Sequence, residues 1–178
     1  MPFATPGACP GSRTPRMLLA LIRHGIAEDA GPATGYRDDQ RRLTPDGANR
    51  IRASAAGIAL LGIRPTAVLT SPLIRCVQTA QIVADRVGVD VRPHDLLRPG
   101  ARGDRLLEVL AEYPEAVCVL VCGHQPDLSH ITQTLTGGMV DYRRGTLGLI
   151  DLSTLQPNHG TLVGLYPAKV LRRMATSP

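Results

Sequence analysis

Short apolar runs alternate with longer segments of helical periodicity along this chain. The runs are typical of strands buried on both faces, and they lie at residues 18–22, 67–70 and 116–122. Elsewhere apolar residues recur every three or four positions, as on one face of a helix, over residues 45–61, 72–87, 104–113 and 126–136. Strands that alternate with helices predict a three-layer α/β/α sandwich with a mostly parallel central sheet.

Two helices are predicted to begin at a hydroxyl residue followed by proline. Thr44 is expected to cap the first helix with Pro45 in its first turn, and Ser71-Pro72 repeats the pattern before the second. Gly62 is expected to end the first helix, because glycine readily takes the conformation found after helix C-termini. The second helix is expected to run to about Val87.

The remaining elements are shorter. We expect a strand over 89–91, a Pro- and Gly-rich loop over 93–103, a helix from Asp104 that stops before Pro114, a helix that ends at Gly137-Gly138, strands over 147–152 and 161–165, and a basic helix over 167–174. Residues 26–42 form a loop that is long for a compact domain, and such loops are often functional. Residues 1–16 are expected to be a disordered N-terminal extension, with one domain over residues 17–174 and Met17 as an alternative start of translation.

The charge of the chain favours an anionic ligand. The net charge is +5, which attracts phosphate groups or nucleic acid. One Phe, four Tyr and no Trp leave too few aromatic side chains for a base-stacking surface, and the basic residues form no block. We therefore expect a phosphate-sized ligand and no nucleic-acid partner. No apolar run is long enough to cross a bilayer, so no membrane partner is expected.

The cysteines predict buried free thiols rather than disulfides. They show no spacing typical of a metal site, and they are Cys9, Cys76, Cys118 and Cys122. Free thiols are typical of a reducing cytoplasm, which is the compartment we expect. Three histidines also lack ligand spacing with a carboxylate, namely His94, His130 and His159. We therefore expect no metal and no cofactor.

Basic side chains lie where three predicted strands end. Arg23-His24-Gly25 follows the first strand, His124 follows the run at 116–122, and Arg75 lies in the first turn of the helix after the second strand. Ligands of open α/β sheets bind at the carboxyl ends of the strands, so we expect these side chains to converge there. The alternative is that each is an unrelated loop or surface residue.

The position of Arg75 indicates a bound anion. The first turn of a helix carries free N–H groups and the positive end of the helix dipole, so a lone cation there is disfavoured. An anion bound at the same place reverses that effect. We therefore expect Arg75 to contact an anion, the alternative being a side chain that turns into solvent.

Two imidazoles and two guanidinium groups around one point suit a phosphoryl group. Guanidinium groups match phosphate oxygens with paired hydrogen bonds. A neutral imidazole can attack phosphorus and form a covalent phosphohistidine. Phosphoryl transfer depends mainly on positioning and charge neutralisation, which the arginines can supply without magnesium.

Three motifs in this order resemble the histidine phosphatase (phosphoglycerate-mutase-like) superfamily. They are Arg23-His24-Gly25, residues 71–80 (SPLIRCVQTA) and residues 123–129 (GHQPDLS). The chain lacks the large insertions of the mutases and acid phosphatases and carries the helix start Leu43-Thr44-Pro45-Asp46-Gly47. It therefore most resembles the SixA-type phosphohistidine phosphatases, over about residues 17–173.

The resemblance implies roles for the converging residues. His24 is the expected nucleophile, which becomes phosphorylated. Arg41 or Arg42, just before the first helix, is expected to add a phosphoryl contact, and nothing in the sequence selects between them. The other groups expected to bind phosphoryl oxygens are Arg23, Arg75 and His124.

The chain departs from the larger family members at the proton donor. Those proteins carry an acidic residue after the third strand or beside the second histidine, and residues 96–100 (LLRPG) hold none. Asp95, Asp104 and Glu28 are nearby candidates, and each is expected to be an ordinary loop or capping carboxylate. Asp127 is expected to cap the following helix rather than orient a neighbouring backbone. The alkoxide of an alkyl phosphate ester needs a proton from a strong general acid to leave, whereas the leaving group of phosphohistidine is imidazole. The site should therefore favour phosphoramidates or activated esters.

The sequence therefore predicts a cofactor-independent phosphatase that acts through a phosphohistidine on His24. The expected substrate is phosphohistidine on a protein, such as a phosphotransfer domain of a two-component system. A phosphatase of a small phosphorylated metabolite is the alternative within the same chemistry. A non-catalytic phosphoprotein-binding module is the alternative outside it, and the presence of both His24 and His124 argues against that module.

Overall fold

Six strands and five helices make up the computed structural model, which describes residues 16–176. The strands are β1 (Met17–Arg23), β2 (Ala67–Thr70), β3 (Val91–Pro93), β4 (Cys118–Gly123), β5 (Leu147–Leu152) and β6 (Gly160–Tyr166). The helices are α1 (Pro45–Leu60), α2 (Ile74–Ala84), α3 (Gly103–Ala111), α4 (Asp127–Thr136) and α5 (Ala168–Met174). Short 3₁₀ turns lie in the loops at Pro32–Thr34, Asp38–Gln40 and Asp95–Leu97. The expected N-terminal extension and Cys9 fall outside the described residues, apart from Arg16.

The strands form one sheet in the order β3-β2-β4-β1-β5-β6. β1, β4, β2 and β3 run parallel, whereas β5 and β6 are antiparallel additions at one edge. β1 and β4 are the two central strands, and all six residues of β4 are buried. This confirms the mostly parallel sheet and the central place of the most apolar run.

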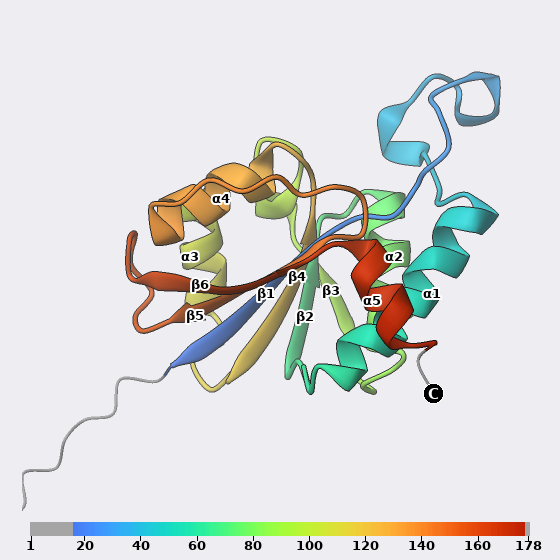
Figure 1. The fold of residues 1–178 in the computed structure, drawn as a ribbon. Coiled ribbons are helices and arrows are strands. Elements are labelled where there is room, and N and C mark those ends of the chain that lie inside the picture. The colour runs from blue at the N-terminus through green and yellow to red at the C-terminus, as the bar shows by residue number, and fades with distance from the viewer. Residues whose placement is uncertain (1–15, 177–178) are drawn as a thin grey trace, which may run out of the picture.

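Helices cover both faces of the sheet. Figure 1 shows α1, α2 and α5 on one side and α3 and α4 on the other. Each layer buries its own cluster of aliphatic side chains against the strands, with Ile51, Ala80 and Leu171 in one cluster and Leu106, Leu110 and Ile131 in the other. The three-layer α/β/α architecture is therefore confirmed.

Several boundaries differ from the prediction. The second helix begins at Ile74, with Leu73 at its N-cap position, and it ends at Ala84; the predicted cap at Ser71 is wrong. The third strand lies two residues later than expected. Thr44 does cap α1, because its hydroxyl accepts the N–H of Gly47 at 2.9 Å.

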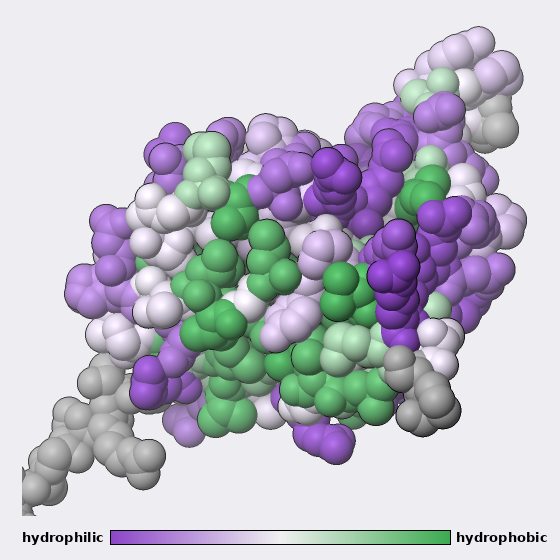
Figure 2. Space-filling model, viewed as in Figure 1, coloured by the Kyte–Doolittle hydropathy of each residue, from purple (hydrophilic) through white to green (hydrophobic). Residues whose placement is uncertain are grey.

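The edge strand β6 presents apolar side chains to the surface. Val163 and Leu165 are exposed, and Figure 2 shows an apolar area over β5 and β6 beside the hydrophilic surface of α5. Within residues 16–176, no helix is long and apolar enough to cross a membrane.

The backbones of α5 and α1 approach each other so closely that no side chain fits between them at one point. Gly57 lies on the buried face of α1, and a Cβ built there would overlap the carbonyl group of Leu171. Glycine is therefore required at this position by the approach of the two helices, although it weakens the helix itself.

Replacement of Gly57 by Ala should destabilise the protein. Alanine normally stabilises a helix by about 1 kcal/mol relative to glycine, but here overpacking should lower the free energy of unfolding by about 2 kcal/mol or more. Urea unfolding of Gly57→Ala measures this, and Ala59→Gly, at an exposed position of the same helix, calibrates the propensity term. A Gly57→Ala protein that is more stable than the wild type would contradict the close approach.

Candidate active site

His24 leaves β1 in an orientation set by a backbone hydrogen bond. Its Nδ1 lies 2.8 Å from the carbonyl oxygen of Gly25, and a carbonyl can only accept, so the hydrogen belongs on Nδ1. The lone pair of the neutral ring is then on Nε2. The Gly25 N–H donates to the Thr79 hydroxyl at 3.1 Å, and that hydroxyl donates to the Arg75 carbonyl at 2.7 Å. The turn after β1 is therefore tied to α2.

The surroundings keep His24 neutral. Burial lowers its pKa to about 3, with further lowering by the charges of His124, Arg75 and Arg23, although the hydrogen bond with Gly25 acts in the opposite direction. The residue as a whole is 7% exposed. At neutral pH the imidazole is therefore unprotonated, with Nε2 available as a nucleophile.

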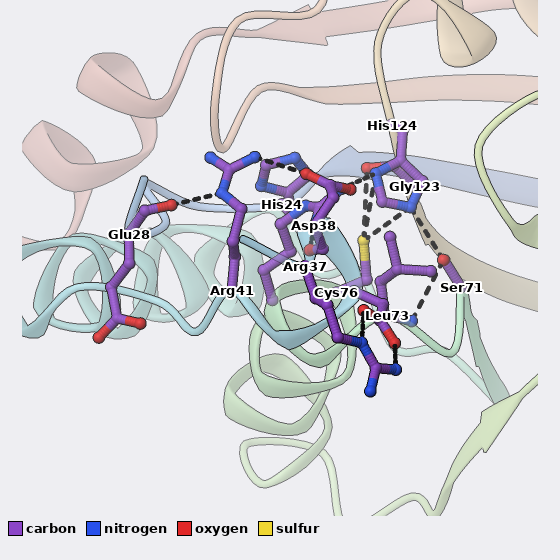
Figure 3. A network of polar contacts seen from close by, with 12 residues as sticks. His24, Glu28, Arg37, Asp38, Arg41, Ser71, Leu73, Cys76, Gly123 and His124 are labelled. Atoms are coloured by element: carbon purple, nitrogen blue, oxygen red, sulfur yellow. Dashed lines mark hydrogen bonds and ion pairs between the residues drawn. The ribbon is translucent and has the colours of Figure 1, made fainter. Parts of the chain in front are cut away.

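His124 follows β4 and lies beside His24. The ring centroids are 5.4 Å apart with an angle of 60° between the planes. The Nε2 atom of His124 lies 2.8 Å from the Ser71 hydroxyl oxygen, and its Nδ1 atom lies 3.5 Å from an Arg75 nitrogen. Because guanidinium nitrogens only donate, the tautomer with hydrogen on Nε2 fits both contacts. Figure 3 shows His124 between Ser71 and Cys76.

Ser71 is a site residue that the sequence analysis assigned to helix capping. Its hydroxyl pairs with His124 and is 3.4 Å from the N–H of Leu73, which precedes the helix. The Ser71-Pro72 pattern predicted a helix cap, but in the structure the Ser71 hydroxyl orients His124 instead. No local pattern in the sequence distinguishes these two uses of a serine.

Arg75 contacts an anion that belongs to the chain itself. Its two terminal nitrogens donate to the backbone carbonyl of Asp38 at 2.7 Å and to the Asp38 carboxylate at 2.8 Å. Its Nε is buried without a hydrogen-bond partner among the described residues. The side chain is turned inward, not into solvent, and Asp38 was missed because it lies in the loop before α1, far from Arg75 in the sequence.

Arg41 shares this carboxylate with Arg75. Arg41 donates to Asp38 at 2.8 Å and to the backbone carbonyl of Glu28, as Figure 3 shows. Partial burial opposes ionisation of Asp38, but hydrogen bonds and charge from Arg41 and Arg75 hold its pKa below the usual value. Arg42 is exposed, so the structure brings Arg41 to the cluster and leaves Arg42 outside it.

Arg23 flanks the histidines from the end of β1. It donates to the Tyr142 carbonyl at 2.8 Å, and its Nε is buried without a partner among the described residues. Burial and the charge of Arg144 lower its pKa. Arg23 therefore joins the cluster through its charge on His24 rather than through a hydrogen bond to it.

Cys76 adds a thiol to the cluster. Its sulfur lies 3.5 Å from Nε2 of His124. Burial opposes ionisation, but hydrogen bonds with Cys122 and His124 and the charges of His124 and Arg75 lower the Cys76 pKa to about 6. Burial raises the pKa of Cys118 and, together with Cys76, that of Cys122. The three described cysteines are buried free thiols, as expected.

The carboxylates considered as proton donors are paired with arginines or exposed at the surface. Asp95 pairs with Arg98 and Asp104 with Arg102 at the surface, and Glu28 is exposed. Within residues 16–176, no group of histidine, cysteine and carboxylate side chains is arranged to hold a metal ion.

The expected capping role of Asp127 is wrong. Its carboxylate accepts the N–H of Gly100 at 2.9 Å, while Pro126 occupies the N-cap position of α4. The side chain therefore orients the backbone of the loop before α3, because its carboxylate is engaged by an N–H of that loop.

Comparisons with known proteins identify similar chains. The sequence profile of the histidine phosphatase superfamily (branch 1) matches residues 19–104. An uncharacterised protein of Picosynechococcus sp. is 36% identical over 145 residues, which cover 75% of this chain and 84% of the relative.

Solved structures share the fold. A protein described as the putative phosphohistidine phosphatase SixA of Nakamurella multipartitia is 27% identical, with a TM-score of 0.69 and coverage of 85% of this chain and 96% of that one. The protein histidine phosphatase SixA complexed with tungstate has a TM-score of 0.77 at 23% identity, covering 86% and 98%. A mycobacterial glucosyl-3-phosphoglycerate phosphatase has a TM-score of 0.60 at 17% identity, covering 83% and 97%.

Asp38→Asn should strengthen the binding of inorganic phosphate. The Asp38 carboxylate pairs with the Arg75 guanidinium. Without the charge of this carboxylate, the guanidinium is free to bind phosphate. Asp38 is half exposed, so the gain should be at most about 1 kcal/mol, or about threefold to fivefold in the dissociation constant. Calorimetric titration measures it, with Asp39→Asn as the control because Asp39 pairs with Arg37 at the surface. Weaker binding by Asp38→Asn would show that the carboxylate positions the arginines instead of competing for them.

The low pKa of His24 should make the protein less stable in mild acid. The unfolded chain takes up a proton near pH 6.5 and the folded chain only near pH 3, so the free energy of unfolding falls as the pH drops between these values. From pH 7 to pH 5 the loss due to His24 should be about 2 kcal/mol. Urea unfolding at both pH values checks this against His24→Asn, which should lack that part of the decrease. Equal decreases in both proteins would contradict the neutral, buried state of His24.

Proposed function

The chain belongs to the histidine phosphatase superfamily, and we propose that it is a phosphatase that removes the phosphoryl group from phosphohistidine on a protein. The observation that carries the proposal is the state of His24. Its ring is neutral, its Nδ1–H is held by the Gly25 carbonyl so that Nε2 carries the lone pair, and the charges of Arg75 and Arg23 act on the ring. The Asp38 carboxylate, which reaches the same cluster, is held ionised.

The proposed reaction has two transfers. In the first, Nε2 of His24 attacks phosphorus, the P–N bond to the substrate imidazole breaks, and the substrate histidine leaves with its electron pair. In the second, a water oxygen attacks phosphorus, the P–Nε2 bond breaks and its electron pair returns to Nε2. Inorganic phosphate leaves with the protons of the water, and the free ring of His24 is restored. The balance needs water alone and no further co-reactant.

The cations have distinct proposed parts in these steps. Arg75 and Arg23 bind phosphoryl oxygens and neutralise their charge, and Arg41 adds a contact from the loop before α1. His124, with a hydrogen on Nε2 shared with Ser71, lies beside the His24 ring, with 5.4 Å between the ring centroids. Asp38 leaves the guanidinium of Arg75 when the phosphoryl group arrives.

The proton balance favours phosphohistidine over an alkyl ester. An alkoxide must be protonated as it leaves, and a positioned general acid contributes about 10²–10⁴-fold to such steps. The carboxylate that reaches the cluster, Asp38, is held ionised by two arginines and cannot supply that proton. An imidazole protonated on its other nitrogen leaves as a neutral molecule and needs no such acid.

Three substrates with different leaving groups test the proposal. Phosphohistidine and p-nitrophenyl phosphate, whose leaving groups need no acid, should be hydrolysed, whereas glycerol 2-phosphate should react at least about 100-fold more slowly in kcat/KM. His24→Ala should abolish all turnover and the acid-labile phosphate trapped on the wild type. His130→Ala, at an exposed histidine of α4, is the matched control and should retain activity.

Each other outcome has a definite meaning. Efficient hydrolysis of glycerol 2-phosphate would indicate a phosphatase of small metabolites with an acid we have not assigned. Turnover by His24→Ala would remove His24 as the nucleophile. Binding of phosphoprotein without turnover by the wild type would indicate a binding module.

A further inference from the structure

A second basic pocket lies on the α1 and α5 side of the molecule. Its volume is about 460 Å³, within the range of small-molecule sites. The face of α1 that carries Arg50 and Ser54 forms one wall, α5 contributes Arg172, and the loop before β5 contributes Arg144. Arg23 lines this pocket as well, whereas His24, Arg75 and His124 do not.

The arginines of this pocket are poorly neutralised. Arg50 pairs with Asp46 at 2.7 Å. Within residues 16–176, neither Arg144 nor Arg172 forms an ion pair with a carboxylate. Burial and the charge of Arg144 lower the pKa of Arg23, and the charge of Asp141 acts in the opposite direction, so Arg144 and Arg23 are like charges held close together. Figure 2 shows strongly hydrophilic side chains gathered over α5.

Within residues 16–176, two buried polar atoms at the pocket have no hydrogen-bond partner. The Ser54 side chain is fully buried, and its hydroxyl makes no hydrogen bond to any described residue. The Nε atom of Arg23 is also buried and makes no hydrogen bond to any described residue. Buried polar groups are normally paired, and an unpaired one costs stability. A serine inside a helix usually bonds to its own backbone, so an unpaired hydroxyl in the wall of the pocket is a candidate contact for a ligand.

We propose that this pocket binds a small molecule with two neighbouring anionic groups, of the bisphosphate or phosphate–carboxylate class. Two guanidinium groups that form no ion pair within residues 16–176, those of Arg144 and Arg172, together with that of Arg23 exceed the charge of one monoanion. The Ser54 hydroxyl and the Arg23 Nε supply the buried hydrogen bonds. The apolar walls, Ile26, Ile51 and Ala168, suit the carbon skeleton that joins the charges. The inference does not depend on which phosphorylated substrate His24 attacks.

Methylenediphosphonate is a suitable probe, because it is a diphosphate analogue in which a carbon replaces the bridging oxygen, so it has no P–O–P bond that can be hydrolysed. Titration of the ¹⁵N-labelled full chain, followed by NMR, should shift the amide signals of Gly47, Ser54 and Arg172 with one dissociation constant. The shifts should persist in Arg75→Ala, which weakens binding in the His24 pocket. They should require an at least tenfold higher probe concentration in Arg144→Ala/Arg172→Ala.

The matched control removes the same charge elsewhere. Arg64→Ala/Arg86→Ala lowers the net charge by two at exposed positions outside the pocket and should change the dissociation constant less than twofold. An equal loss in both double variants would show non-specific attraction and overturn the proposal. Shifts confined to the surroundings of Ser71, Cys76 and His124 would place the probe in the His24 pocket alone and would overturn it too.

Ser54→Ala separates ligand binding from a structural role. Without probe, loss of the unpaired hydroxyl should leave the thermal midpoint unchanged or raise it. With saturating probe, the rise in midpoint should be smaller than in the wild type, and the dissociation constant should increase at least threefold. A lower midpoint without probe and unchanged probe binding would show that the hydroxyl serves the fold, and would remove Ser54 from the site.

Discussion

The register of β1 against β4 is the constraint on which the site depends. These strands are separated by about a hundred residues, yet they pair in parallel with Arg23 opposite Gly123. His24 and His124 therefore leave the sheet at neighbouring points of the same edge. A slip of one residue would turn the side chains of a strand to the opposite faces. Both strands are packed on both faces by aliphatic side chains, and that packing fixes the register.

The second constraint is electrostatic. A neutral imidazole is placed beside the guanidinium groups of Arg75 and Arg23 in a buried position, where a protonated ring would be costly. The protein lowers the cost of its own cations by setting the Asp38 carboxylate against Arg75 and Arg41. The loop before α1 is thus part of the site, and its length follows from the need to reach back to α2.

Local patterns in the sequence were sufficient for the sheet, for most helices and for the four basic residues at the strand ends. Apolar runs and helix caps are set by residues that are close in the sequence. Because parallel strands all end at the same edge of the sheet, the residues that follow them lie close together there. The sequence did not reveal that Asp38 meets Arg75, that Ser71 bonds to His124 instead of capping α2, or that Cys76 lies against the second histidine. Each of these is a contact between distant segments, and each residue has an ordinary local alternative. The choice between Arg41 and Arg42 was open for the same reason, since adjacent residues in a loop differ only in the direction the backbone gives them.

The hydrogen bond from His24 to the Gly25 carbonyl has a consequence for the second half of the proposed reaction. Once Nε2 carries a phosphoryl group, the proton on Nδ1 gives the ring a positive charge, and the carbonyl dipole is already placed to stabilise it. When the P–Nε2 bond breaks, its electron pair returns to this positively charged ring, so His24 leaves phosphorus as a neutral imidazole. The contact that aims the lone pair in the attack therefore also prepares the ring for its own displacement by water, which shortens the life of the covalent intermediate.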